Sequence, residues 1–151
     1  RDLYHITRQT SNLLKTGDKM IKEKALEYFK NGYSCSESIV QACIDEGLCD
    51  KSLLPCATTF SAGMSSGCIC GTIAGAQLVL GYIFGRNNKF NNQTSAREKA
   101  ALLVEEFKKR NKITCCRILC LGLEGSAKKE HCSKLVNDSA EILEELIKVK
   151  V

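Results

Sequence analysis

The stretch ICGTIAGAQLVLGYIF, residues 69–84, decides the fold, because it is apolar on nearly every side. It lies within residues 52–85, which contain no Asp, Glu, Lys or Arg. A helix that is apolar all round is buried, either in a protein core or in a membrane. A membrane span needs about 18 or more predominantly apolar residues, and Gly, Thr and Gln77 interrupt this shorter run. We therefore expect a buried central helix and no membrane span.

Glycine recurs at four-residue intervals in and around this stretch. The positions are Gly67, Gly71 and Gly75, and then Gly81 and Gly85. A stripe without side chains lets another helix backbone approach closely. The stripe predicts tight packing of the central helix, and a homodimer contact is the alternative that the same pattern allows.

Apolar residues spaced three and four apart predict two helices before the central one. The first follows Asp18, which can cap it, and ends at Gly32. The second starts at Ser34 and ends at Gly47. Ser34 and Glu37 have the spacing of a capping box, in which each side chain binds a backbone N–H that the helix leaves unpaired.

Three further helices are predicted after the central one. Ser95 and Glu98 have the spacing of a second capping box. Thr114 can cap a short helix that Gly122 ends, and Gly125 precedes the last helix. The last helix has one apolar stripe, formed by Cys132, Leu135, Val136, Ala140, Leu143, Leu146 and Ile147.

No segment alternates apolar and polar residues as a half-buried strand does. We therefore predict an all-α fold, an irregular bundle of six or seven helices around a buried, Gly-rich central helix. Residues 1–17 are expected to form an N-terminal helical extension, and residues 18–151 are expected to form a single domain.

The composition is that of one globular domain. The chain has 151 residues, of which 44% are hydrophobic and 26% charged, and its net charge is +5. Such a small basic surplus sets solubility rather than identifying a partner. The outer face of the helix after residue 95 is basic, but no nucleic-acid recognition motif accompanies it. We expect no nucleic-acid binding; the face is either a solvated surface or a docking site for an acidic redox partner.

The unusual feature is the presence of ten Cys beside no Trp and two His. Disulfide scaffolds exceed about 8–10% Cys in a short secreted chain, and this chain is both longer and poorer in Cys. It also shows no start of the kind that directs secretion. We therefore expect reduced thiols and a cytoplasmic protein.

Three cysteines are predicted at the starts of helices: Cys35, Cys70, and Cys116 beside Cys115. Unpaired N–H groups and the positive end of the helix dipole favour thiolate there, so we expect lowered pKa values. Cys132 lies in the apolar stripe of the last helix, where it has a function only if the other thiols meet it. Free Cys also packs as a small hydrophobe, the role expected of Cys43, Cys49, Cys56 and Cys120.

Five segments carry, in this order, a resemblance to a known family. They are GYSC (residues 32–35), SAGMSSGCICGTIAGA (61–76), CCR (115–117), CSKLV (132–136) and AEIL (140–143). From about residue 20 to residue 148 the chain resembles the C_GCAxxG_C_C family, which is named for redox activity. The resemblance implies a small helical domain, similar to one in split-Soret cytochromes c, in which an iron–sulfur cluster is expected.

Carried over by position, the family cysteines are Cys35, Cys70, Cys116 and Cys132. Cys68 lies close to Cys70 in the sequence, and Cys115 lies next to Cys116. Which cysteine of each pair binds the metal group therefore stays open. The sequence contains no C-x-x-C-H haem motif, so the cytochrome half of the resemblance does not apply.

The first hypothesis is a redox protein in which these four thiolates hold a 2Fe-2S or 4Fe-4S cluster and pass electrons to a partner protein. Gly67 and Gly71 would let the backbone come close to the cluster. No dinucleotide-binding or phosphate-binding fingerprint accompanies the cysteines. An electron carrier or redox accessory protein is therefore favoured over a self-contained enzyme.

Two alternatives use the same cysteines. In a thiol–disulfide oxidoreductase, Cys35 or Cys70 would attack and a neighbour would resolve, with Cys68–Cys70 and Cys115–Cys116 as the obvious pairs. In a structural zinc site, the four family cysteines would bind one ion.

Overall fold

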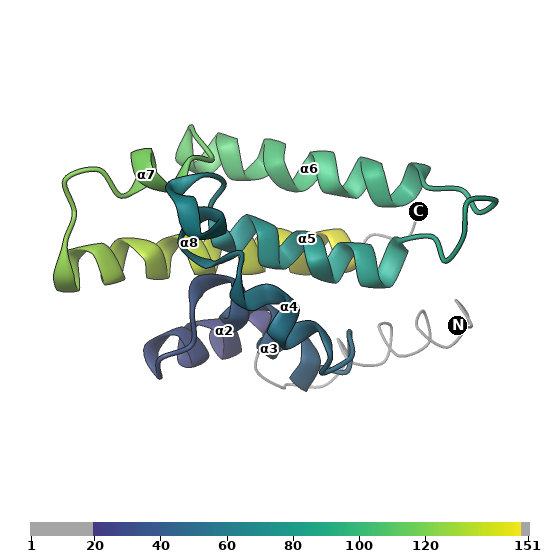
Figure 1. Ribbon diagram of the computed structural model, residues 1–151, viewed down its shortest axis with the longest axis horizontal. Helices are drawn as coiled ribbons and strands as arrows, with labels where there is room; N and C mark the ends of the chain where they lie inside the picture. The colour runs from purple at the N-terminus through teal and green to yellow at the C-terminus, as the bar shows by residue number, and fades with distance from the viewer. Residues whose placement is uncertain (1–19, 149–151) are drawn as a thin grey trace.

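The computed structural model describes residues 20–148 and is all-α in that range, as the sequence predicts (Figure 1). The only β-type pairing among these residues is an isolated antiparallel bridge between Ile69 and Cys115. Seven α-helices and one irregular turn, η1, follow in chain order: α2 (Ile21–Lys30), α3 (Cys35–Asp45), α4 (Leu53–Thr58), η1 (Gly63–Gly67), α5 (Gly71–Phe84), α6 (Thr94–Asn111), α7 (Cys116–Leu119) and α8 (Gly125–Lys148). The predicted helical extension over residues 1–17 and the predicted Asp18 cap lie outside the described residues.

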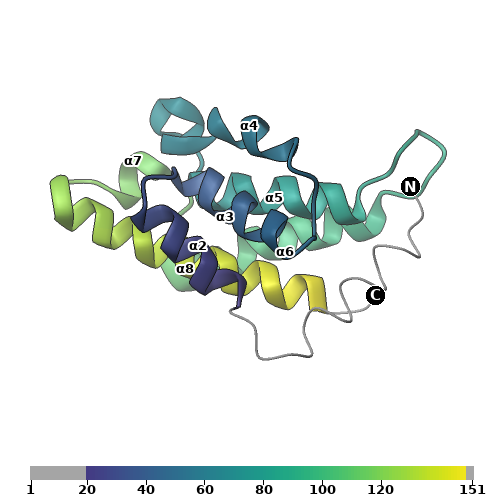
Figure 2. The same cartoon turned by 90° about the horizontal axis from the view of Figure 1, so that it is seen from below.

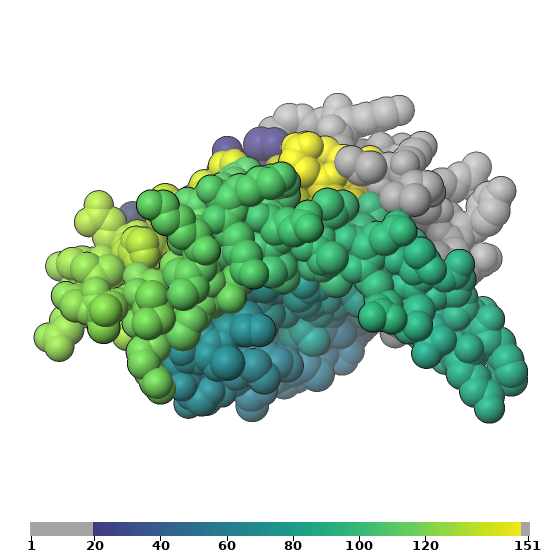
Figure 3. Space-filling view, turned by 90° about the horizontal axis from the view of Figure 1, so that it is seen from above, coloured from purple at the N-terminus to yellow at the C-terminus, as the bar shows by residue number. Residues whose placement is uncertain are grey.

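Helix α5 packs against α3, α4, α6 and α8, and eight of its 14 residues are buried. Figure 1 shows α6 running along one side of α5, with α8 behind. In Figure 2, α2 and α3 lie on the opposite side, with α4 beside α3. Figure 3 shows α6 and α7 covering the upper face. The prediction of a buried central helix is therefore confirmed, and no helix within residues 20–148 has the length and apolar character needed to cross a membrane.

The glycine stripe of α5 serves the contact between α5 and α3. A Cβ on Gly75 would lie 2.7 Å from the backbone oxygen of Ser36, and a Cβ on Gly71 would overlap the sulfur of Cys35. Gly81 differs, since a Cβ there would meet nothing within 4 Å. Close helix approach therefore explains Gly71 and Gly75 within one chain.

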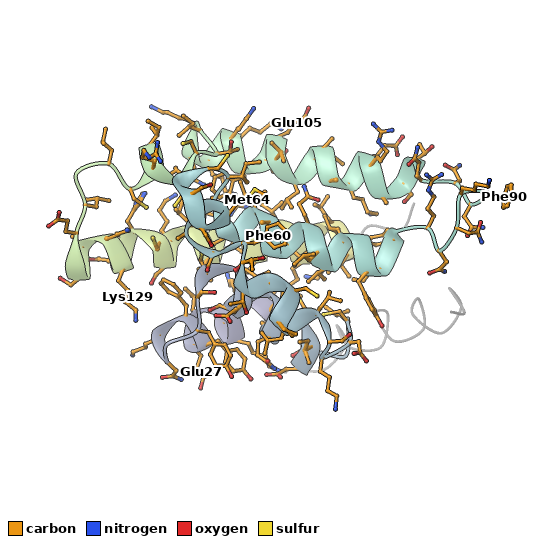
Figure 4. All side chains as sticks on the ribbon, in the orientation of Figure 1. Glu27, Phe60, Met64, Phe90, Glu105 and Lys129 are labelled. Atoms are coloured by element: carbon orange, nitrogen blue, oxygen red, sulfur yellow. The ribbon has the colours of Figure 1, made fainter. Side chains whose placement is uncertain are left out.

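An apolar pocket of about 490 Å³ lies along α5 on the side where Gly81 is exposed to open space. Leu78 and Val104 line it from α5 and α6. Phe60 and Met64, which precede α5 in the chain, complete its wall, and both are labelled in Figure 4. The described part of the core is thus well packed around α3 and α8, and less so on this side of α5.

The Ser34–Glu37 capping box is confirmed at the start of α3. The Ser34 hydroxyl accepts from the Glu37 N–H, and the Ser34 N–H donates to Glu37 Oε1 over 3.0 Å. Gly32, just before it, has φ +105°, a conformation that favours glycine and lets α2 end there.

The second predicted capping box, Ser95–Glu98, is wrong. Helix α6 begins one residue earlier, at Thr94, and no side chain caps it. The Thr94 N–H instead binds the Asn92 side chain over 2.8 Å, so the Asn-rich loop starts the helix before Ser95 can cap it.

The predicted Thr114 cap is also wrong, and the central helix starts later than predicted. The Thr114 carbonyl accepts from the Cys70 N–H over 2.8 Å, so this residue joins two segments instead of capping α7. Ile69, beside it, pairs with Cys115 and lies outside α5. This small junction brings the starts of α5 and α7 together.

The apolar stripe of α8 is confirmed over most of its length. The buried members are Leu135, Val136, Ala140, Leu143, Leu146 and Ile147. Cys132, at the N-terminal end of the stripe, is only half-buried. It lies where α8 passes the junction between α5 and α7.

Candidate functional site

Five cysteine thiols gather where α3, α5, α7 and α8 meet, and we call them the thiol cluster. Cys35 is the first residue of α3, Cys70 precedes α5, Cys116 and Cys120 stand at the two ends of α7, and Cys132 lies in α8. The Sγ atoms of Cys120 and Cys132 are 3.8 Å apart. The charge of Cys35 acts on Cys70, Cys116 and Cys132, so the four cysteines predicted as site residues lie near one another.

The electrostatics of these thiols reflect the same proximity. Burial is the main cause that raises the pKa values of Cys70, Cys116 and Cys132, and negative charge on the nearby Cys35 raises each of them further. Charge on Cys120 also raises the pKa of Cys35. Each thiolate would thus disfavour the next, so several thiolates can coexist here only beside a cation or another source of positive charge.

Cys35 and Cys70 are positioned by the α3–α5 contact. The capping box fixes the first turn of α3, and Gly71 leaves the space that the Cys35 sulfur occupies. On the other side, the Cys70 sulfur lies 3.2 Å from the Thr72 hydroxyl, which lies 2.7 Å from the hydroxyl of Ser139 in α8. A buried polar chain therefore connects the start of α5 to α8 next to the thiols.

The η1 turn holds an unusual backbone close to the thiols. Ala62, Met64 and Ser65 have φ values of +53°, +58° and +56°, in the left-handed region that is costly for residues with a Cβ. The Ala62 N–H hydrogen-bonds to the Cys35 sulfur and lowers the pKa of that thiol, against the larger effect of burial. The strained turn thus aims a backbone donor at the cluster.

Contacts with α7 hold this turn in place. The Cys116 N–H donates to the Cys68 carbonyl, and Arg117 Nη2 donates to the Ser66 carbonyl over 3.0 Å. Gly63 and Gly67 make room for these contacts, since a Cβ on Gly63 would lie 2.6 Å from the Cβ of Cys116, and one on Gly67 would lie 3.1 Å from Arg117 Nε. Gly67 therefore faces Arg117, whereas Gly71 faces a cluster sulfur.

The prediction that helix starts lower the thiol pKa values is wrong. Burial raises the pKa values of Cys35 and Cys70, despite lowering contributions from backbone N–H groups and, at Cys70, the Thr72 hydroxyl. Burial also raises the pKa of Cys116 to about 11 and that of Cys132 to about 12. The free energy that a thiolate loses on leaving water exceeds the stabilisation that these hydrogen bonds give it. Burial therefore favours the thiol over the thiolate at these four cysteines in the metal-free chain.

The structure separates the two ambiguous pairs. Cys70 is buried whereas Cys68 is exposed, and the Cys115 sulfur donates to the Gly67 carbonyl over 3.4 Å instead of facing the other thiols. Of each pair, Cys70 and Cys116 are therefore the members that share the cluster.

The expected packing role is confirmed for Cys43 and Cys49, which are buried in the core. It is wrong for Cys56, which is exposed, and for Cys120, which belongs to the thiol cluster. Cys120 follows Cys116 by four residues, a spacing that places two side chains on one face of a helix. That spacing was the signal in the sequence that could have identified it.

The donor set fits a soft, thiolate-bound group better than a hard cation. Cysteine sulfur selects zinc, copper(I) or iron–sulfur clusters. Within residues 20–148, however, no three or more His, Cys, Asp or Glu side chains surround one point closely enough to bind a single metal ion. The chemistry of the cluster therefore fits such a group, while its spacing does not fit one ion.

Comparison with known proteins gives one family. The family model described as "Putative redox-active protein (C_GCAxxG_C_C)" matches residues 33–146, a range that contains all five thiols of the cluster. No curated protein and no solved structure matches the chain.

Proposed function

This chain belongs to the C_GCAxxG_C_C family, and on that premise we propose that it is an electron-transfer protein that binds an iron–sulfur cluster through Cys35, Cys70, Cys116 and Cys132. The observation that carries the proposal is that Cys35 lies near three thiols that are far from it in the sequence, since its charge raises the pKa values of Cys70, Cys116 and Cys132. An iron–sulfur cluster, when bound, accepts and returns electrons.

The surroundings of the thiols suit them to this role. The four thiols would lose their protons on binding, because only thiolate ligates, so their raised pKa values couple binding to proton release. The Ala62 N–H and the Thr72 hydroxyl then stabilise negative charge on Cys35 and Cys70. Hydrogen bonds to sulfur and restricted solvent access are the means by which a protein sets a redox potential.

A mononuclear zinc site is the weaker candidate. Structural zinc takes four ligands at about 2.0–2.3 Å around one ion, and the described side chains do not surround such a point. A polynuclear group can span more widely separated sulfurs, and this favours iron with sulfide as the metal group.

We further propose a cytoplasmic setting and an acidic redox partner. All ten cysteines are free, which suits a reducing compartment. Residues 107–123, which carry α7 and two cluster cysteines, contain five basic and no acidic residues. Lys109 and Arg110 form ion pairs with carboxylates. The exposed Lys108, Lys112 and Arg117 would steer a negatively charged partner to the site.

The experiment that tests the proposal is a comparison of metal content among single Cys variants. Cys35→Ser, Cys70→Ser, Cys116→Ser and Cys132→Ser should each lose most of the iron and sulfide that the wild-type chain binds after anaerobic purification. Cys56→Ser is the matched control, since it removes an exposed thiol outside the cluster and should bind as much as wild type. Full iron and sulfide in all four variants would refute the ligand assignment.

A further inference from the structure

We infer that Cys120 and Cys132 form a thiol–disulfide exchange site whose substrate is a low-molecular-weight disulfide. Their sulfurs are 3.8 Å apart and both side chains are half-buried, so a small reagent can reach them. A disulfide bond is about 2.0 Å long. Closing the pair thus requires the sulfurs to approach by less than about 2 Å.

The backbone around Cys120 allows this movement. Helix α7 has four residues and none of them is buried. Leu121, the next residue after Cys120, is 72% exposed, and Gly122 has φ +76°. Cys132 is held in the regular helix α8, so we expect the α7 side of the pair to move.

The cysteine pairs that are adjacent or nearly adjacent in sequence are less well placed. Cys68 is exposed while Cys70 is buried. Cys115 donates to Gly67 whereas Cys116 faces the cluster. The structure therefore favours a pair that joins α7 to α8.

The reaction proceeds in two exchanges. The thiolate of one cysteine attacks the small disulfide RSSR, forms a mixed protein–SR disulfide and releases RS⁻, which takes up a proton. The second cysteine loses its proton, attacks the protein sulfur and displaces the second RS⁻, which is protonated in turn. The two protein thiols are oxidised to a disulfide and RSSR is reduced to two RSH.

One consequence rests on the proposed function. Cys132 cannot ligate iron while it is bonded to Cys120. The disulfide would therefore block loading of the iron–sulfur cluster, and reduction would restore it. Cys120 would in that case regulate the site without being one of its four ligands.

The test begins with the metal-free, reduced chain and glutathione disulfide as the probe. Trypsin cleaves after Lys and Arg, so Cys120 is released in residues 118–128 and Cys132 in residues 130–134, and neither peptide contains a second Cys. Mass spectrometry without reduction should find these two peptides linked. Cys56→Ser should give the same linkage. In Cys120→Ser, the peptide of residues 130–134 should not be linked to the peptide of residues 118–128.

The second measurement is iron uptake from ferrous iron and sulfide after the same treatment. Oxidised wild type should take up little iron until dithiothreitol is added. The inference is overturned if the two wild-type peptides stay unlinked, or if Cys120 is found linked to Cys116 instead. If neither the reduced nor the oxidised chain takes up iron, the proposed function fails, while the peptide linkage still decides the disulfide.

Discussion

Glu37 has two hydrogen-bond partners and helps to fix the position of Cys35, the first thiol of the cluster. Glu37 accepts from the Ser34 N–H over 3.0 Å with one oxygen and from the Thr58 hydroxyl over 2.9 Å with the other. It therefore connects the start of α3 to the end of α4 within two residues of Cys35. Hydrogen bonds to the ionised carboxylate, first of all from the Ser34 backbone, lower the pKa of Glu37.

This lowered pKa predicts a loss of stability in acid. The carboxylate contributes its full stabilisation above the unfolded pKa of about 4.3 and loses it as the pH falls through the lower folded value. Glu37→Gln keeps an oxygen acceptor but cannot titrate. We expect the free energy of unfolding, measured in urea, to fall more steeply for wild type than for Glu37→Gln below about pH 5. Parallel curves would show that Glu37 contributes no pH dependence.

At the residue scale, the sequence was informative where a local pattern decides the outcome. The Ser34–Glu37 box involves neighbours in the chain, and it was predicted correctly. The Ser95–Glu98 box failed because a nearby side chain, Asn92, supplied a competing start. The thiol pKa values were mispredicted for a different reason, since burial is a tertiary property that the sequence does not display.

At the scale of elements, the packing of α5 on α3 depends on Gly75 and does not depend on Gly81. Gly75 faces the Ser36 backbone at a distance that excludes a methyl group, whereas Gly81 faces the open side of the helix. Both lie within α5, so their intrinsic helix propensities are the same. The two positions therefore separate packing from propensity.

Alanine at these two positions should have opposite effects. Gly81→Ala should raise the free energy of unfolding by about 0.5–1 kcal/mol, because alanine restricts the unfolded chain and meets no neighbour. Gly75→Ala should lower it by about 1–3 kcal/mol, because the added methyl pushes α3 away from α5. Urea denaturation of both variants checks this. Stabilisation by both substitutions would contradict the close contact.

At the scale of the whole molecule, the all-α fold followed from the helical periodicity, but the composition of the thiol cluster did not. Apolar spacing and glycine positions identified α2, α3, α6, α7 and α8 around α5, including the stripe of α8, but they did not identify the short helix α4. Cys35 and Cys132 meet only because α3 and α8 pack around the start of α5, a long-range arrangement that spacing alone cannot give. The family resemblance identified four of the five thiols, and the structure added Cys120, which lies beside Cys132.

The thiol cluster is built from two parts of the molecule. The contacts among α3, α5 and α8 position Cys35, Cys70 and Cys132, which lie on long helices or at their starts. The short helix α7 provides the exposed side, with Cys116 and Cys120.

The most direct test of the central claim is the visible absorption spectrum of the anaerobically purified chain, with iron, sulfide and zinc quantified on the same sample. The proposed function predicts broad visible absorption with iron and sulfide in equal amounts. A colourless protein would contradict it: bound zinc would then indicate a structural site, and the absence of any metal would leave thiol–disulfide chemistry as the function of the cluster.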